Sequence, residues 1–153
     1  ACGFLSPDQG EVTILGGAGF DPGRLKGRLS AMPQDAALGR ETRCLDHLLY
    51  FGRLQGLGAA EARREAERVL GEVGLGERTR HKTKTLSHGM LRRLAIAQAL
   101  LGKPELVLLD EPTSGLDPRH AHELREILKA QRRGRTLVIS SHNSPRGSIA
   151  SAR

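Results

Sequence analysis

Asp110 and Glu111 are neighbouring carboxylates whose position in the sequence suits metal binding and proton transfer. They follow directly on the apolar run at 106–109, which predicts a strand buried on both faces. Pro112 ends that strand, because proline has no N–H to donate to a neighbouring strand. Open α/β sheets bind their ligands at the carboxyl ends of strands. Two adjacent carboxylates repel each other, so we expect Mg²⁺ at one of them and proton abstraction from water by the other.

Two more predicted strands lead into polar side chains that could join this acidic pair. Residues 28–33 lead into Gln34, whose amide can donate and accept a hydrogen bond at once. Residues 136–140 form another predicted buried strand, and His142 follows it. A lone glutamine or histidine in a loop is most often structural or merely exposed. We favour a function for both because of the motifs that accompany them.

The segment Leu-Ser-His-Gly-Met at 86–90 begins a predicted helix and could receive a phosphate. Ser87 is a preferred N-cap residue, and a helix N-terminus presents free N–H groups and the positive end of a dipole. Gly89 lets a phosphate or another backbone approach closely. The alternative is an ordinary helix start, in which Ser87 only caps.

The helices that must position these segments are predicted from apolar periodicity. We expect helices at 42–55 and 59–73, a third from Ser87 to about residue 101, and a fourth from Pro118 to about residue 131. Pro118 suits the first turn of a helix, and Asp117 comes directly before it.

In type, order and spacing, these segments resemble the nucleotide-binding domain of ATP-binding cassette (ABC) proteins. Five segments carry the resemblance: Gln34 (Q-loop), 86–90 (signature), 106–111 (Walker B and its glutamate), 114–117 (D-loop) and His142 (switch histidine). The resemblance covers the chain from about Gly3 to Asn143. It implies an α/β fold, with a P-loop NTPase-like core of parallel sheet plus a helical signature subdomain, incomplete at both ends.

The resemblance implies that ATP and Mg²⁺ are the cofactors, and it gives four residues a role in the chain's own nucleotide site. Asp110 would hold Mg²⁺ through water, and Glu111 would polarise the attacking water. Gln34 would contact both the Mg²⁺ and that water. His142 would contact the γ-phosphate and help to hold the water.

Three further residues are implied to act on the nucleotide of an opposing subunit. Ser87 and Gly89 would bind the γ-phosphate held by a second nucleotide-binding domain. Asp117 would cross the interface of the resulting homo- or heterodimer.

The sequence departs from the family pattern at two places. The signature has His88 where a second glycine is usual and Met90 where glutamine is usual, which indicates a modified signature. The Walker A loop, Gly-x-x-x-x-Gly-Lys-Ser/Thr, does not occur: only Lys103 follows a glycine, and Pro104 comes after it. We therefore expect a fragment that begins just after the Walker A helix and is inactive as an ATPase by itself.

Composition limits the domain count and the partners. A chain of 153 residues suits one modest domain; we expect a partial ABC ATPase domain at 1–143, with its helical subdomain at about 42–86, and a disordered or truncated tail at 144–153. The net charge of +7 is dispersed and only 3% of residues are aromatic, so we expect no nucleic-acid partner. Cys2 and Cys44 are too few and too far apart to indicate a metal site, and they suggest a reducing compartment.

The function implied by the resemblance is an ATP-hydrolysing subunit of an ABC transporter, of exporter type. A transmembrane permease subunit would hold it at the inner face of the cell membrane, on the cytoplasmic side. Two alternatives are a non-transport ABC ATPase, such as a translation or repair factor, and a degenerate regulatory cassette that lends only its signature to an intact subunit.

Overall fold

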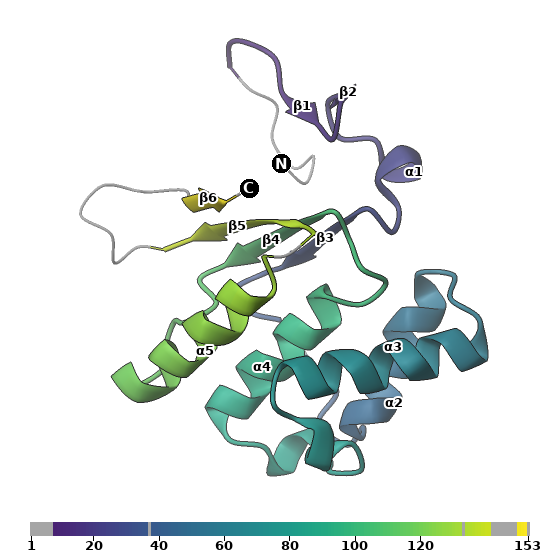
Figure 1. Cartoon of the computed structure of the whole chain (residues 1–153), viewed down its shortest axis with the longest axis vertical. Coiled ribbons are helices and arrows are strands. Elements are labelled where there is room, and N and C mark those ends of the chain that lie inside the picture. The colour runs from purple at the N-terminus through teal and green to yellow at the C-terminus, as the bar shows by residue number, and fades with distance from the viewer. Residues whose placement is uncertain (1–7, 37, 133, 142–149, 153) are drawn as a thin grey trace.

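The computed structural model describes residues 8–36, 38–132, 134–141 and 150–152, and its centre is a four-stranded sheet (Figure 1). The strands are ordered β3 (Leu29–Met32), β4 (Leu106–Asp110), β5 (Thr136–Ser140) and β6 (Ala150–Ala152). The first three strands run parallel, and β6 pairs antiparallel with β5. The predicted α/β class with a parallel sheet is thereby confirmed.

The register of the parallel strands brings their carboxyl ends to one edge. Met32 lies beside Leu109, and Leu109 lies beside Ile139. Asp110 lies beside Ser140, at the last position of both strands. Whatever follows β3, β4 and β5 therefore begins at the same edge of the sheet.

Two helices cover one face of this sheet, and two more lie to its side. Figure 1 shows α4 (His88–Ala99) and α5 (Pro118–Ala130) on the covered face. The helices α2 (Cys44–Leu54) and α3 (Ala59–Glu72) pack on each other, and both contact α4. Within the described ranges, no helix has the length and apolar character needed to cross a membrane.

Short elements complete the described chain. A two-stranded hairpin and a single-turn helix lie on the other side of the sheet, away from α4 and α5 (Figure 1). These elements are β1 (Thr13–Ile14), β2 (Gly17–Ala18) and α1 (Pro22–Leu25). Two 3-10 turns connect α3 to α4: η1 (Gly76–Arg78) and η2 (Thr83–Thr85).

The core is aliphatic, as expected of a chain with few aromatic residues. Five fully or almost fully buried side chains from four elements form its centre: Leu70, Leu94, Ile96, Leu109 and Leu124. They come from α3, α4, β4 and α5, so the core joins the side pair of helices to the sheet through α4.

The strand predicted to be buried on both faces is buried on only one. Val107 and Leu109 of β4 are buried, whereas Leu106 and Leu108 are only partly buried. In β5, Leu137 alone is buried. The prediction was wrong on this point because α4 and α5 cover a single face, and a continuous apolar run does not reveal how many faces its neighbours cover.

The two predicted helix starts near the candidate site are confirmed by their caps. The Ser87 hydroxyl accepts a hydrogen bond from the backbone N–H of Met90 at 3.3 Å. Asp117 caps α5, and Pro118 occupies the first turn. Both helices begin where cap chemistry predicts, because the capping side chain satisfies N–H groups that have no partner within the helix.

The helix α2 begins two residues later than predicted. Thr42 is held in an extended segment, where its carbonyl accepts from the backbone N–H of Thr83 at 3.0 Å. Arg43 forms an antiparallel bridge with Lys82. This pairing with the 81–83 segment overrides the local helical pattern. It also buries Cys44, whose thiol donates to a backbone carbonyl, and burial raises the pKa of that thiol.

Two short strands lie towards the ends of the described chain. Thr13–Ile14 pair only with the two residues of β2. The tail at 144–153 was expected to be disordered or truncated; its residues 144–149 and 153 lie outside the described residues, and Ala150–Ala152 form a strand against β5. Three small residues carry no periodic signal, so their pairing is set by the neighbouring strand.

Candidate functional site

The acidic pair lies where the sequence predicted it, at the carboxyl edge of the sheet. Asp110 is the last residue of β4 and is exposed, whereas Glu111 comes after it and is only 8% exposed. Glu111 has a φ of +46°, in the left-handed region that non-glycine residues rarely adopt. Backbone strain of this kind is concentrated at functional sites, where the surrounding structure must hold it.

Ser140 holds both acidic residues, and no sequence motif had indicated it. Its hydroxyl donates a hydrogen bond to Asp110 Oδ1. The same oxygen accepts from the backbone N–H of Glu111 at 3.1 Å. One hydroxyl on β5 thus fixes the Asp110 carboxylate and the strained backbone of Glu111. Its only sequence signal is that it ends the strand predicted at 136–140.

Gln34 follows β3 by two residues and is therefore close to the same edge. Its backbone carbonyl accepts from Arg92 Nη1 at 2.5 Å, which ties the loop after β3 to α4. The side chain of Gln34 is exposed. His142, the fourth residue expected here, lies outside the described residues.

The donor set at this edge suits Mg²⁺. Magnesium prefers hard oxygen ligands and usually takes only one or two carboxylates, with waters and phosphates in its remaining positions. Asp110 offers an exposed carboxylate, and Gln34, two residues after the neighbouring strand, is exposed as well. Among the described residues, no group of three or more His, Cys, Asp or Glu side chains is placed to hold a metal ion.

The residues expected to face an opposing subunit form a second group. Ser87 and Gly89 lie at the start of α4, and Asp117 lies at the start of α5. A Cβ placed on Gly89 would lie 3.5 Å from His120 Cδ2, so the start of α4 is adjacent to the first turn of α5. The structure therefore brings these three residues together within one chain.

Asp117 is held by the first turn of its own helix. One carboxylate oxygen accepts from the backbone N–H groups of Arg119 and His120, both at 3.1 Å. The other oxygen is paired with His120 Nδ1. These hydrogen bonds, that of the His120 side chain first among them, lower the pKa of Asp117, so the side chain stays ionised as an N-cap.

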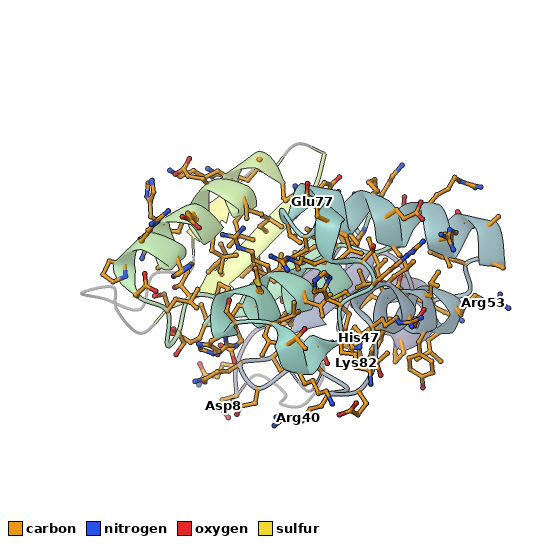
Figure 2. All side chains as sticks on the ribbon, turned by 90° about the horizontal axis from the view of Figure 1, so that it is seen from below. Asp8, Arg40, His47, Arg53, Glu77 and Lys82 are labelled. Atoms are coloured by element: carbon orange, nitrogen blue, oxygen red, sulfur yellow. The ribbon has the colours of Figure 1, made fainter. Side chains whose placement is uncertain are left out.

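A groove of about 440 Å³ separates the Gln34 loop from the segment that leads into α4. Its lining includes the apolar side chains of Leu38, Leu86 and Leu91, and basic side chains outnumber the one acidic side chain, that of Asp35. The basic residues are Arg40, Lys84 and Arg92. Figure 2 shows Arg40 and Lys82 projecting outward on the same side of the molecule, and Glu41 pairs with both Lys82 and Lys84.

Comparison with known proteins agrees with this geometry. The model of the ABC transporter family matches residues 1–114. The linearmycin resistance ATP-binding protein LnrL of Bacillus subtilis (strain 168) is 37% identical over 142 residues, which are 92% of this chain and 46% of that protein. The human phospholipid-transporting ATPase ABCA7 is 37% identical over 142 residues, covering 92% of this chain and 7% of that protein.

The chain thus spans about half the length of the bacterial relative and a small part of the human one. The family match ends at Ser114, so it includes Gln34, Ser87, Gly89, Asp110 and Glu111. The aligned relatives extend over more of the chain than the family match does. With its parallel sheet, its acidic edge and these matches, the chain belongs to the ABC transporter family.

Proposed function

We propose that this chain is part of the ATP-hydrolysing subunit of a membrane transporter. The observation that carries the proposal is that the residues after two neighbouring parallel strands, Gln34 after β3 and the Asp110–Glu111 pair at the end of β4, begin at the same edge of the sheet in a chain of the ABC family. Mg²⁺, when bound there, would neutralise the negative charge of the ATP phosphates.

Each residue at the edge has one task in this proposal. Asp110 takes the metal, and Ser140 keeps its carboxylate in one orientation. Glu111 orients and polarises the water that attacks the γ-phosphate. Gln34 can donate to one neighbour and accept from another, which suits a residue between metal and water. His142 assists from the segment that follows β5.

The phosphate-binding loop is a separate requirement. Catalysis of phosphoryl transfer depends on positioning and charge neutralisation, and the Walker A backbone and lysine supply much of both. The 153-residue sequence contains no such loop. We propose that this chain by itself neither binds ATP tightly nor hydrolyses it, and that a protein with a Walker A loop supplies the missing contacts.

A second nucleotide-binding domain completes the arrangement. Ser87, Gly89 and Asp117 lie at the starts of α4 and α5, which are adjacent to each other. In the proposed dimer they face the nucleotide held by the other subunit, where the N–H groups at the start of α4 can bind phosphate.

The basic groove is the proposed docking site for a cytoplasmic segment of the permease. Its apolar lining residues suit an amphipathic segment, and Arg40, Lys84 and Arg92 suit acidic side chains on that segment. Docking there would place the subunit on the inner face of the membrane. The names of the two relatives refer to linearmycin resistance and to phospholipid transport, which favours an exporter.

The Glu111→Gln variant tests the catalytic assignment in the natural protein that contains this chain. The amide has a similar size but cannot act as a base, so ATP hydrolysis should fall by roughly 10²- to 10⁴-fold while nucleotide binding is retained. Steady-state phosphate release and nucleotide binding are the two measurements.

Glu126→Gln is the matched control, because Glu126 is an exposed glutamate on α5 whose contact is with Lys129. That variant should hydrolyse ATP at the normal rate. Hydrolysis that persists in Glu111→Gln would remove Glu111 from the reaction. A natural protein that hydrolyses no ATP at all would favour the regulatory cassette.

A further inference from the structure

We propose that His88 is a positioning residue that ties the start of α4 to the turn at 113–116 and, through that turn, to Glu111. The inference rests on the proposed function for its consequence, but the contact itself stands on the structure. His88 Nδ1 lies 3.2 Å from the carbonyl oxygen of Gly115. That oxygen can only accept, so the Nδ1 atom of His88 carries the proton and donates.

The turn that receives this hydrogen bond is built on Glu111. The backbone N–H of Ser114 donates to the Glu111 carbonyl at 3.1 Å, and that of Leu116 donates to the Thr113 carbonyl at 3.3 Å. Gly115 lies in the second of these turns, directly after the end of the first. A displacement of Gly115 is therefore passed through the Ser114 hydrogen bond to the strained backbone of Glu111.

Space at Gly115 is fitted to the His88 ring. A Cβ on Gly115 would lie 2.9 Å from His88 Cε1, closer than such atoms approach in real structures. Gly115 also has a φ of +73°, which favours glycine for a second reason. The ring and the turn therefore fill the space between them, beyond the hydrogen bond that joins them.

A neighbouring contact supports the same connection. Gly89, the next residue of α4, is adjacent to the His120 ring, and His120 is paired with Asp117. The first two residues of α4 thus contact two consecutive segments. His88 contacts the turn at 113–116, and Gly89 lies against the first turn of α5. The signature and the D-loop are joined inside one chain before any partner is present.

His88 is the residue at which this signature departs from the usual glycine. Glycine has no side chain and can make neither the hydrogen bond nor the ring contact. The connection is therefore a property of this sequence: His88 places a donor where the D-loop turn needs one. With it, movement of the signature at the start of α4 reaches the turn that begins at Glu111.

Hydrogen exchange in the natural protein that contains this chain tests the connection without nucleotide. In His88→Ala, the amides of residues 114–117 should exchange several-fold faster than in the parent protein, while the melting temperature changes little because His88 is exposed. His88→Asn keeps a side-chain N–H donor, because Asn Nδ2 is as many bonds from Cβ as His Nδ1, but it lacks the ring, so it should restore part of the protection. His122→Ala removes another exposed histidine, on α5, and should leave residues 114–117 unchanged.

A double-mutant comparison separates the contact from general loosening. Gly115→Ala should lower the melting temperature, and it should lower it less when His88 is already alanine, because the clash with the ring is then gone. Equal effects of Gly115→Ala in both backgrounds would contradict the ring contact. Unchanged exchange of residues 114–117 in His88→Ala would overturn the proposal.

The rate of ATP hydrolysis provides the functional readout, and it is interpreted separately. We expect His88→Ala to lower the rate and His88→Asn to recover part of it. A protein that shows the exchange effect but no hydrolysis would keep the connection and reject the proposed function. A protein in which hydrolysis is normal in both variants would restrict His88 to a structural contact and contradict its positioning role.

Discussion

At the residue scale, the hydroxyl of Ser140 lies between two groups that would otherwise have to be held separately. It donates to the Asp110 carboxylate and accepts from the Glu111 N–H. A serine can do both because its hydroxyl is one donor and two acceptor lone pairs. Alanine at this position would leave the Glu111 backbone in its left-handed conformation with one restraint fewer.

Ser140→Ala should therefore lower both stability and metal-dependent activity. We expect the free energy of unfolding to fall by about 1 kcal/mol, the usual net value of a lost hydrogen bond at a partly exposed site. The Mg²⁺ concentration for half-maximal hydrolysis should rise, because the Asp110 carboxylate loses its fixed orientation. Urea denaturation and a Mg²⁺ titration of the natural protein are the measurements. Ser140→Thr keeps the hydroxyl and should recover both properties; failure of that rescue would show that side-chain volume, and not the hydroxyl, matters there.

At the element scale, α2 and α4 are joined by a buried histidine. His47 on α2 is 5% exposed, and its Nε2 lies 2.8 Å from Gln98 Oε1 on α4. Burial lowers the pKa of His47, and the Gln98 hydrogen bond offsets this only in part. The imidazole is therefore kept neutral in the folded state to a lower pH than in the unfolded chain.

This shift predicts a loss of stability on acidification. Below the unfolded pKa of about 6.5 the unfolded chain takes up a proton that the folded chain resists, so stability falls as the pH drops from about 7 towards the lowered folded pKa. Above about pH 7 the group is neutral in both states and contributes nothing to the slope. His47→Gln should flatten the dependence between pH 7 and 5.5 in urea denaturation, and His122→Gln, at an exposed position, should not. An unchanged slope in His47→Gln would assign the acid sensitivity to other groups.

The elements whose positions were predicted well are those whose signals are local. The apolar run before Asp110 and the Asp117-Pro118 cap fixed the end of β4 and the start of α5, because each depends on a few consecutive residues. The start of α2 was missed because Thr42 is paired with Thr83, which is distant in sequence. Ser140 was missed for the same reason. It contacts the acidic pair because it is aligned with Asp110, and the register between two strands cannot be predicted from the sequence of either strand alone.

At the scale of the whole molecule, the loop after β3 begins at the carboxyl edge of the sheet and also lines the basic groove. Arg92 reaches from α4 to the Gln34 carbonyl and also lines the groove. A permease segment in the groove would therefore contact the loop that carries Gln34, the residue proposed to contact the metal. We expect the partner to act by changing the position of Gln34.

Charge reversal at the groove should weaken the association with the permease. Arg40→Glu places a negative charge where we expect acidic partner side chains, so the amount of permease recovered with the protein should fall several-fold at low ionic strength, and less at high salt. Arg53→Glu is the matched control, because Figure 2 shows Arg53 projecting at the far end of the helical pair, away from Arg40. Equal losses in both variants would indicate a general charge effect and not a docking site.

The order of the strands has a consequence for how the protein is made. Arg28 and Glu105 come directly before the first residues of β3 and β4, and their side chains pair with each other. They are 77 positions apart in the chain. A ribosome adds about 5–20 residues per second, so β3 leaves it roughly 4–15 s before its neighbouring strand has been synthesised. During that interval α2 and α3, which pair locally, can already fold, whereas β3 has an open edge. The carboxyl edge that includes Asp110 and Glu111 can therefore form only after β4 has been synthesised. A pause in translation before residue 106 would prolong the exposure of β3 to chaperones and to other nascent chains.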